Sequence, residues 1–185
     1  AFDWVLPSLI PYKGKGLTHI SKVWFDYVGL VLPNHLLTTE TKDFPPALAP
    51  FAGLLAKRSM LVKRTKVIPV ECVVRGYLSG SGWKEYKTTG KICGIRIHKG
   101  LRESDQLAEP VFTPSTKAES GHDLNITEAE AAAIVGPDVA GKVRDLSVEI
   151  YSRGAEHALG CGIILADTKF EFGLVTGPDG GDQII

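Results

Sequence analysis

The sequence lacks an excess of charge of either sign and any long apolar run. Its 185 residues carry 21 lysines and arginines against 21 aspartates and glutamates, so the charge does not indicate a nucleic acid or an anionic membrane as a partner. There is neither a charged start followed by an apolar signal core nor an apolar run long enough to span a bilayer. We therefore expect a cytoplasmic protein that binds neither nucleic acid nor a membrane.

Cysteine is also scarce. Cys72, Cys93 and Cys161 are widely spaced and odd in number, which fits neither a disulfide framework nor a zinc site built from closely spaced cysteine pairs. We expect reduced, mostly buried thiols. Internal repeats and low-complexity segments are absent too, and the length allows one large domain or two lobes sharing a cleft.

The order of apolar patterns predicts an α+β protein rather than a regular doubly wound sheet. Residues 102–122 are polar and poorly periodic, which predicts a long functional loop. Thr127 and Glu130 form a capping-box pattern ahead of an alanine-rich helix. Further helices are expected over residues 18–30 and from Pro137, and strands over 58–67, 68–77, 92–97 and 163–172, followed by a hairpin turn at 177–181.

The most distinctive stretch is LADTKFEFG, residues 165–173. Read as a strand, it places Asp167, Lys169 and Glu171 on one face and apolar side chains on the other. Two carboxylates beside an ammonium group suit a magnesium nucleotide, because oxygen ligands hold the cation and the ammonium balances phosphate charge. The alternative is a solvated strand face whose lysine is neutralised by its flanking acids.

A second stretch, VIPVECVVRGYLSGSGW, runs from Val67 to Trp83. Its strand would carry Glu71 and Arg75 on one face and lead into glycines interleaved with Ser79 and Ser81. Small residues let the backbone approach an anion, hydroxyls donate to it, and a following helix would present free N–H groups. The alternative is a glycine turn with a serine helix cap. It is not a P-loop, because it lacks the lysine followed by Ser or Thr.

A third stretch, FTPSTKAESGHD, ends at Asp123. Lys117 between hydroxyl residues could hold an anionic substrate, and His122 with Asp123 could orient a proton donor. The alternative is a solvated loop made of turn-forming residues.

In this order and at this separation, the three stretches closely resemble the phosphoribosylaminoimidazole-succinocarboxamide synthase (SAICAR synthetase) family of purine biosynthesis. AFDWVLPSLIPYKGKGLTHIS, FPPALAPF and RSMLVKRTKVIPV match as well, so the resemblance covers nearly the whole chain. It implies a two-lobed SAICAR synthetase-like fold, akin to ATP-grasp proteins and kinases, with antiparallel sheets and an ATP cleft between the lobes. Residues 1–66 would belong to the N-terminal lobe, and residues 67–185 would form the interlobe strand and an incomplete C-terminal lobe.

The resemblance further implies an ATP- and Mg²⁺-dependent ligase that joins L-aspartate to carboxyaminoimidazole ribonucleotide. The substrate carboxylate would take the γ-phosphoryl group, and the aspartate amine would then displace phosphate. Phosphoryl transfer of this kind needs positioning and charge neutralisation more than a protein nucleophile. The implied roles are metal binding by Glu171; catalytic contacts by Asp167 and Lys169; ribonucleotide phosphate binding by Arg75, Ser79 and Ser81; adenine contacts by Val67, Pro69 and Glu71; and a place in the site for Lys117, His122 and Asp123.

The sequence also departs from the family pattern. Family members begin with a glycine-rich GK-x-RD segment that covers ATP phosphates, and they continue beyond the hairpin into a second acidic magnesium ligand and an arginine-bearing substrate segment. GKVRDL at residues 141–146 lies inside a predicted helix and is interpreted as a coincidence. We therefore expect that both ends are cut and that this fragment is inactive.

Two other functions remain open at this point. A small-molecule kinase would use the same two lobes and acidic strand, but it would not require an amine substrate. A non-catalytic nucleotide-binding module would keep the fold without turnover. The oligomeric state cannot be predicted from the sequence.

Overall fold

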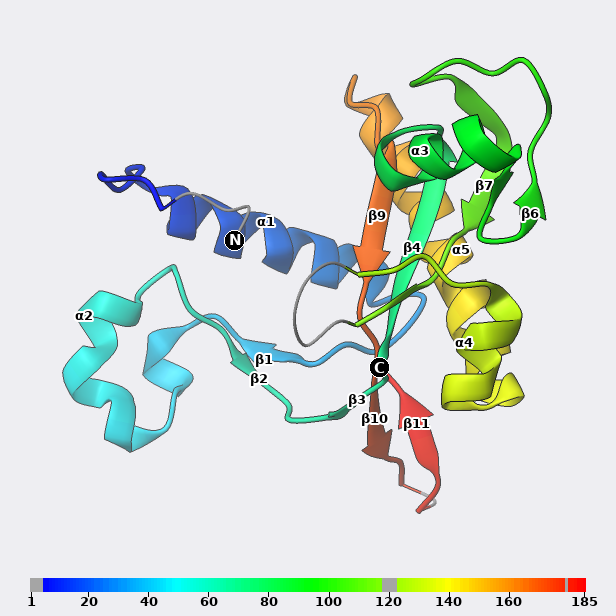
Figure 1. Cartoon of the computed structure of the whole chain (residues 1–185). Helices are drawn as coiled ribbons and strands as arrows, with labels where there is room; N and C mark the ends of the chain where they lie inside the picture. The colour runs from blue at the N-terminus through cyan, green and yellow to red at the C-terminus, as the bar shows by residue number, and fades with distance from the viewer. Residues whose placement is uncertain (1–4, 118–122, 179) are drawn as a thin grey trace. The chain divides into compact units, whose positions relative to one another are not determined.

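The computed structural model of the chain describes residues 5–117, 123–178 and 180–185. The chain divides into an N-terminal unit, Ala1–Arg64, and a C-terminal unit, Thr65–Ile185 (Figure 1).

The N-terminal unit begins with helix α1, Lys13–Val28. The helix starts before residue 18, where the sequence predicted its beginning, and Gly14 in its first turn lies against the side chain of Arg58. Packing therefore outweighs the low helix propensity of glycine there. The other elements of the unit are β1 (Leu36–Thr38), η1 (Thr41–Asp43), η2 (Pro46–Phe51), α2 (Ala52–Leu55) and β2 (Leu61–Val62), with β1 and β2 antiparallel.

The C-terminal unit is built around strand β4, Val70–Tyr77. On one side β4 pairs with β7 (Gln106–Phe112) and β8 (Ser115–Thr116), and on the other with β9 (Asp167–Phe170). All three pairings are antiparallel, as expected from the sequence. Six of the eight residues of β4 have buried side chains, namely four apolar ones together with Glu71 and Arg75. The strand therefore forms the centre of the unit.

Strands β7 and β8 correct the prediction of a continuous loop over residues 102–122. The loop was predicted because the segment is polar and poorly periodic, and β7 also contains Pro110. A proline is tolerated here because β7 is an edge strand, whose outer N–H groups need no partner strand. The inward side chains Leu107 and Phe112 are buried.

A second, three-stranded sheet follows the order β11–β10–β3, with β3 at Lys66–Val67, β10 at Gly173–Thr176 and β11 at Asp182–Ile184. The predicted single strand over residues 163–172 therefore begins later, at Asp167, and the chain passes from β9 to β10 through Glu171 and Phe172. The hairpin turn between β10 and β11 is confirmed, with the Gly177 N–H donating to the Gly181 carbonyl at 2.7 Å.

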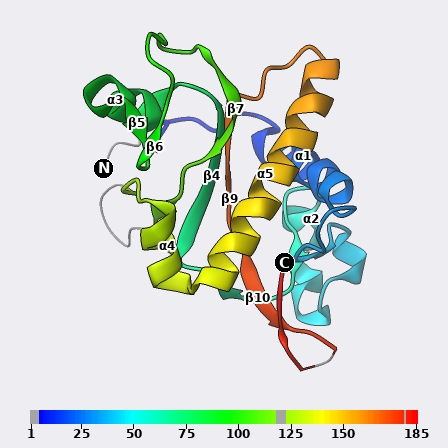
Figure 2. The same cartoon turned by 90° about the vertical axis from the view of Figure 1, so that its right-hand side faces the viewer.

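Two helices pack on the larger sheet. Helix α5, Pro137–Gly160, lies against β4, β7 and β9, and α4, Glu128–Val135, packs beside it (Figure 2). The predicted capping box is confirmed: Thr127 accepts from the Glu130 N–H at 3.2 Å, and the Glu130 carboxylate accepts from the Thr127 N–H at 2.7 Å. The hydrogen bonds that the Glu130 carboxylate accepts from the Thr127 N–H and hydroxyl lower the pKa of Glu130. GKVRDL lies inside α5, as predicted.

A further apolar cluster lies where helix α3, Gly80–Thr89, meets the hairpin of β5 (Lys91–Ile92) and β6 (Ile95–Arg96). Its buried members are Leu78, Ile92, Cys93, Ile97 and Leu107. The cluster fixes α3 against the end of β7, and so it sets the position of the turn that joins β4 to α3.

The close approach of β4 to α5 gives a stability prediction. A Cβ at Gly76 would overlap the hydroxyl of Tyr151, which donates to the Leu165 carbonyl at 2.7 Å just before β9. Gly76→Ala should therefore lower the free energy of unfolding by about 2 kcal/mol. Gly141→Ala is the matched control, because a Cβ there meets nothing within 4 Å. This variant should gain about 0.5–1 kcal/mol in the helix interior.

Thermal and urea unfolding of the two alanine variants measure this difference. Equal stabilities would show that Tyr151 moves freely and does not fix the segment that leads into β9.

The cysteines give a second prediction. Cys72 and Cys93 are buried and Cys161 is exposed, and burial raises the pKa of the two buried thiols from 9.0 to about 12. At pH 8, iodoacetamide should therefore label Cys161 alone, because the thiolate is the reactive form. Mass spectrometry of the native and urea-unfolded protein reads this directly, and labelling of Cys72 in the native protein would contradict it.

The raised pKa values of Cys72 and Cys93 also determine how stability changes at alkaline pH. Between about pH 9 and pH 12 the unfolded state loses thiol protons that the folded state keeps. Stability must therefore fall as the pH rises through this window.

Candidate functional site

Strand β4 separates two kinds of side chain. Gly76, and with it Cys72 and Val74, belongs to the face covered by α5, so Glu71, Val73 and Arg75 belong to the opposite face. Arg75 is paired with Asp167 of β9, and Val73 with Lys169. Directly opposed residues share a face, so the two sequence motifs meet on the side of the sheet away from α5.

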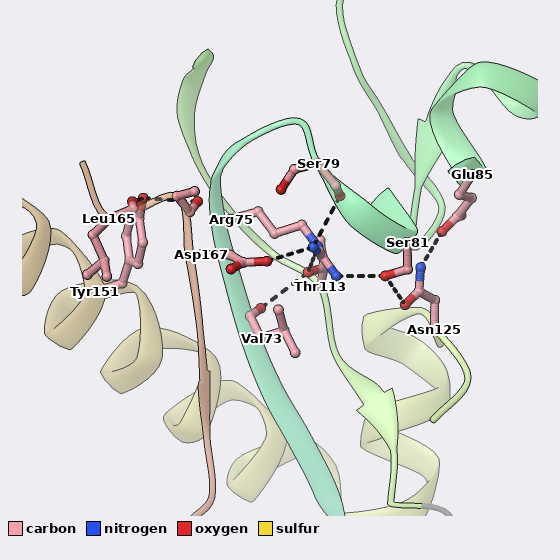
Figure 3. A network of polar contacts seen from close by, with 11 residues as sticks. Val73, Arg75, Ser79, Ser81, Glu85, Thr113, Asn125, Tyr151, Leu165 and Asp167 are labelled. Carbon is pink, nitrogen blue, oxygen red and sulfur yellow. Dashed lines mark hydrogen bonds and ion pairs between the residues drawn. The ribbon is translucent and has the colours of Figure 1, made fainter. Parts of the chain in front are cut away.

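Arg75 is at the centre of a polar network (Figure 3). Only 6% of it is exposed. Its guanidinium donates four hydrogen bonds: to Thr113 Oγ1 at 3.1 Å, the Ser79 carbonyl at 3.4 Å, Asp167 Oδ2 at 3.0 Å and Ser81 Oγ at 2.8 Å. A guanidinium has five N–H donors in a fixed fork. Arg75 therefore connects β4, β9, the residue that follows β7 and the turn before α3.

The turn before α3 is shaped to approach a ligand closely. Ser79 is the N-cap of α3, and its side chain makes no capping hydrogen bond, so the alternative of a serine cap does not explain this serine. Gly80 has a φ of 57°, and a Cβ at Gly82 would lie 3.1 Å from Arg75 Cδ. The first N–H groups of α3 and the exposed Ser81 hydroxyl thus lie beside a buried arginine, which is a favourable place for an anion.

A second cluster surrounds Glu71, which is only 3% exposed. Lys169 Nζ lies 3.4 Å from Glu71 Oε2, and Lys117 Nζ lies 3.5 Å from Glu71 Oε1. Glu71 Oε2 has no hydrogen-bond partner. Burial of a charge is costly unless it is paired, and the two lysines supply this pairing.

The two lysines also reach outward. Lys117 Nζ lies 2.6 Å from Glu171 Oε2 and Lys169 Nζ lies 3.5 Å from Asp123 Oδ2. The hydrogen bond that Lys117 donates to Glu171 is the largest cause of a raised pKa of Lys117, so Lys117 stays charged at neutral pH. All three sequence stretches therefore contribute charged groups to one face.

The other predicted site residues are placed less centrally. Val67, in β3, and Pro69 are exposed on the segment that leads into β4. His122 lies outside the described residues. Sequence reasoning missed Thr113, Glu85 and Asn125, which bind within the Arg75 network. Thr113 and Asn125 lie within or two residues beyond the FTPSTKAESGHD stretch, which was the available signal.

The side chains that could act as metal ligands show what kind of magnesium site this chain could form. Among the described residues, no three His, Cys, Asp or Glu side chains lie close enough together to hold a metal ion. Mg²⁺ is usually bound through one or two carboxylates, with waters and substrate phosphates completing its shell. The half-exposed Glu171 fits an ion that arrives with nucleotide phosphates, and does not fit a cage made by protein alone.

The described residues also contain no helix with the length and apolar character needed to cross a membrane.

Comparison with known proteins bears on the whole chain. The SAICAR synthetase family model matches residues 1–182. Phosphoribosylaminoimidazole-succinocarboxamide synthases from Desulforapulum autotrophicum and Desulfosudis oleivorans are 56% and 57% identical over 95% and 96% of this chain, respectively. The chain spans 60% and 61% of the length of these curated relatives.

A solved structure gives the same result for the fold. SAICAR synthase from Saccharomyces cerevisiae, in complex with SAICAR, superposes with a TM-score of 0.85 at 39% identity. The match covers 100% of this chain and 66% of the yeast chain. The α+β fold with antiparallel sheets, the motifs and these matches agree, and the chain belongs to the SAICAR synthetase family.

Proposed function

We propose that the protein containing this chain is the ATP-dependent ligase that joins L-aspartate to carboxyaminoimidazole ribonucleotide, giving the succinocarboxamide, ADP and phosphate. The observation that carries the proposal is the meeting of three separate stretches on one face of the β4–β9 pair, within a chain that matches the family from residue 1 to residue 182. The yeast relative is described as a complex with the product SAICAR.

The residues divide by charge into two parts of one site. Ser79, Ser81, Arg75 and the first turn of α3 bind the ribonucleotide phosphate, since they combine hydroxyl, guanidinium and backbone N–H groups. Asp167 orients Arg75 across the strand pair at 3.0 Å.

The cluster around Glu71 lies where the phosphoryl group is transferred in this proposal. Lys169 and Lys117 carry positive charge beside a carboxylate that keeps them in place, and they neutralise charge as the phosphoryl group is transferred. Glu171 holds Mg²⁺, which supplies charge neutralisation at the phosphates when it is bound. Asp123 completes this side, His122 takes part in substrate binding, and Val67 and Pro69 contact the adenine from the segment before β4.

The same proposal includes the remaining expectations from the sequence. The lobes divide near residue 66, the enzyme binds ATP, and it works in the cytoplasm. Its partners are small molecules: ATP, L-aspartate and the ribonucleotide.

The test uses a protein of the relatives' length, because this chain spans about 60% of them. A hybrid in which this chain replaces the matching segment of the Desulforapulum enzyme should release ADP only when aspartate and the ribonucleotide are both present. ADP release that needs no aspartate would favour a kinase, since a kinase requires no amine.

A further inference from the structure

The Ser81 hydroxyl donates its hydrogen to another residue of the protein. A hydroxyl carries one hydrogen and two lone pairs. Arg75 donates to Ser81 Oγ at 2.8 Å, and Ser81 donates to Asn125 Oδ1 at 3.4 Å (Figure 3). An unprotonated phosphate oxygen accepts hydrogen bonds, so Ser81 can donate to it only after its hydrogen turns away from Asn125.

The orientation of Asn125 is fixed by a glutamate. Asn125 Nδ2 donates to Glu85 Oε2 at 2.9 Å, and the Cys93 N–H donates to Glu85 Oε1 at 2.9 Å. An ionised carboxylate accepts and cannot donate. The nitrogen of Asn125 must therefore face Glu85, which leaves its oxygen toward Ser81. Glu85 and Asn125 are half-buried and Ser81 is exposed. The series of hydrogen bonds therefore leads from two half-buried side chains to a hydroxyl that faces solvent.

Asn125 also takes part in a short pairing next to Lys117 and Asp123. It forms a β-bridge with Ser115. Beside the bridge, the Thr116 N–H donates to the Leu124 carbonyl at 2.9 Å and the Leu124 N–H donates to Thr116 Oγ1 at 3.1 Å. The hydrogen-bond chain from Glu85 thus ends at the phosphate-binding turn on one side and at the base of the lysine-bearing segment on the other.

We propose that Asn125, held by Glu85, is a positioning residue. It accepts the hydrogen bond of the Ser81 hydroxyl until an anionic oxygen of a ligand accepts that hydrogen bond instead. Ligand binding then exchanges the long Ser81–Asn125 hydrogen bond for one to the ligand, and it releases Asn125 at the base of the Lys117 segment. The inference rests on the proposed function, because it takes Ser81 to contact the substrate phosphate.

Glu85→Gln tests the donor and acceptor order of the hydrogen bonds that link Glu85, Asn125 and Ser81. The glutamine oxygen must accept from the Cys93 N–H, so its nitrogen faces Asn125. Asn125 then turns its oxygen to Gln and its nitrogen to Ser81. Both lone pairs of Ser81 are now filled, and its hydrogen points to the ligand. Binding of inorganic phosphate to the 185-residue chain should tighten by about three- to tenfold, the equivalent of one hydrogen bond.

Loss of the Glu85 charge would also favour an anion, so the measurement is made in two backgrounds. In the Ser81→Ala background only the charge effect remains, and the gain from Glu85→Gln should be at least threefold smaller. Asn125→Ala, which removes the acceptor without a change of charge, should tighten phosphate with Ser81 present and have no effect without it. Glu156→Gln, on exposed α5 surface, is the control and should leave binding unchanged.

Calorimetry or NMR titration gives each dissociation constant, and thermal unfolding verifies that each variant is folded. An equal gain in both backgrounds, or weaker binding in Glu85→Gln, would overturn the inference. So would the absence of phosphate binding to the parent chain. These results are separate from the ligase proposal, which is judged by aspartate-dependent ADP release in the hybrid and does not depend on how Ser81 is held.

Discussion

Replacement of Lys169 by Met is expected to lower kcat of the hybrid enzyme by about a hundredfold or more. Lys169 Nζ lies on the charged face 3.4 Å from the buried Glu71, and loss of one preorganised group that stabilises developing charge typically costs this much. ADP release at saturating aspartate and ribonucleotide measures it. Because Lys117 still pairs with Glu71 in this variant, the protein should remain folded.

The matched control is Lys87→Met, which removes an exposed lysine of α3. It should leave kcat unchanged. A kcat of Lys169→Met within threefold of the parent enzyme, with the protein folded, would exclude Lys169 from the chemistry and leave it as a structural partner of Glu71.

Replacement of Arg75 by Lys is expected to impair both folding and binding. Lysine keeps the charge but lacks the planar fork, so it cannot reach Thr113, the Ser79 carbonyl, Asp167 and Ser81 together. Loss of two or three of these hydrogen bonds should lower the free energy of unfolding by about 2–3 kcal/mol, or Tm by about 5–10 °C. The KM for the ribonucleotide should rise at least about tenfold.

Arg96→Lys provides the comparison, since Arg96 is exposed on the short strand β6. Its stability should stay within about 0.5 kcal/mol of the parent. If Arg75→Lys were equally stable and its KM unchanged, the four hydrogen bonds of Arg75 would hold neither the turn nor the ligand.

The faces of the two signature strands could be predicted from the sequence because they follow from a period of two. Alternation alone placed Asp167 with Lys169 and Glu71 with Arg75, and the β4–β9 register brings these pairs together. The helix that begins at Pro137 and the capping box at Thr127 were predictable for a similar reason, since their signals lie within a few residues of one another.

Other features depend on contacts between distant residues, which no local pattern contains. Strand β7 was missed because its segment is polar and poorly periodic, and only pairing with β4 makes the segment a strand. Thr113 lies 38 residues beyond Arg75, and Asn125 lies 40 residues beyond Glu85. Each is an ordinary polar residue in the sequence and acquires a role through the fold alone.

The most direct measurement is ADP release by the hybrid enzyme with ATP and the ribonucleotide, first without and then with L-aspartate. We predict almost no ADP without aspartate, and with it one ADP released for each succinocarboxamide formed. Release of ADP at the same rate without aspartate, or its absence under both conditions from a folded hybrid, would contradict the assignment of this chain to an amide-forming ligase.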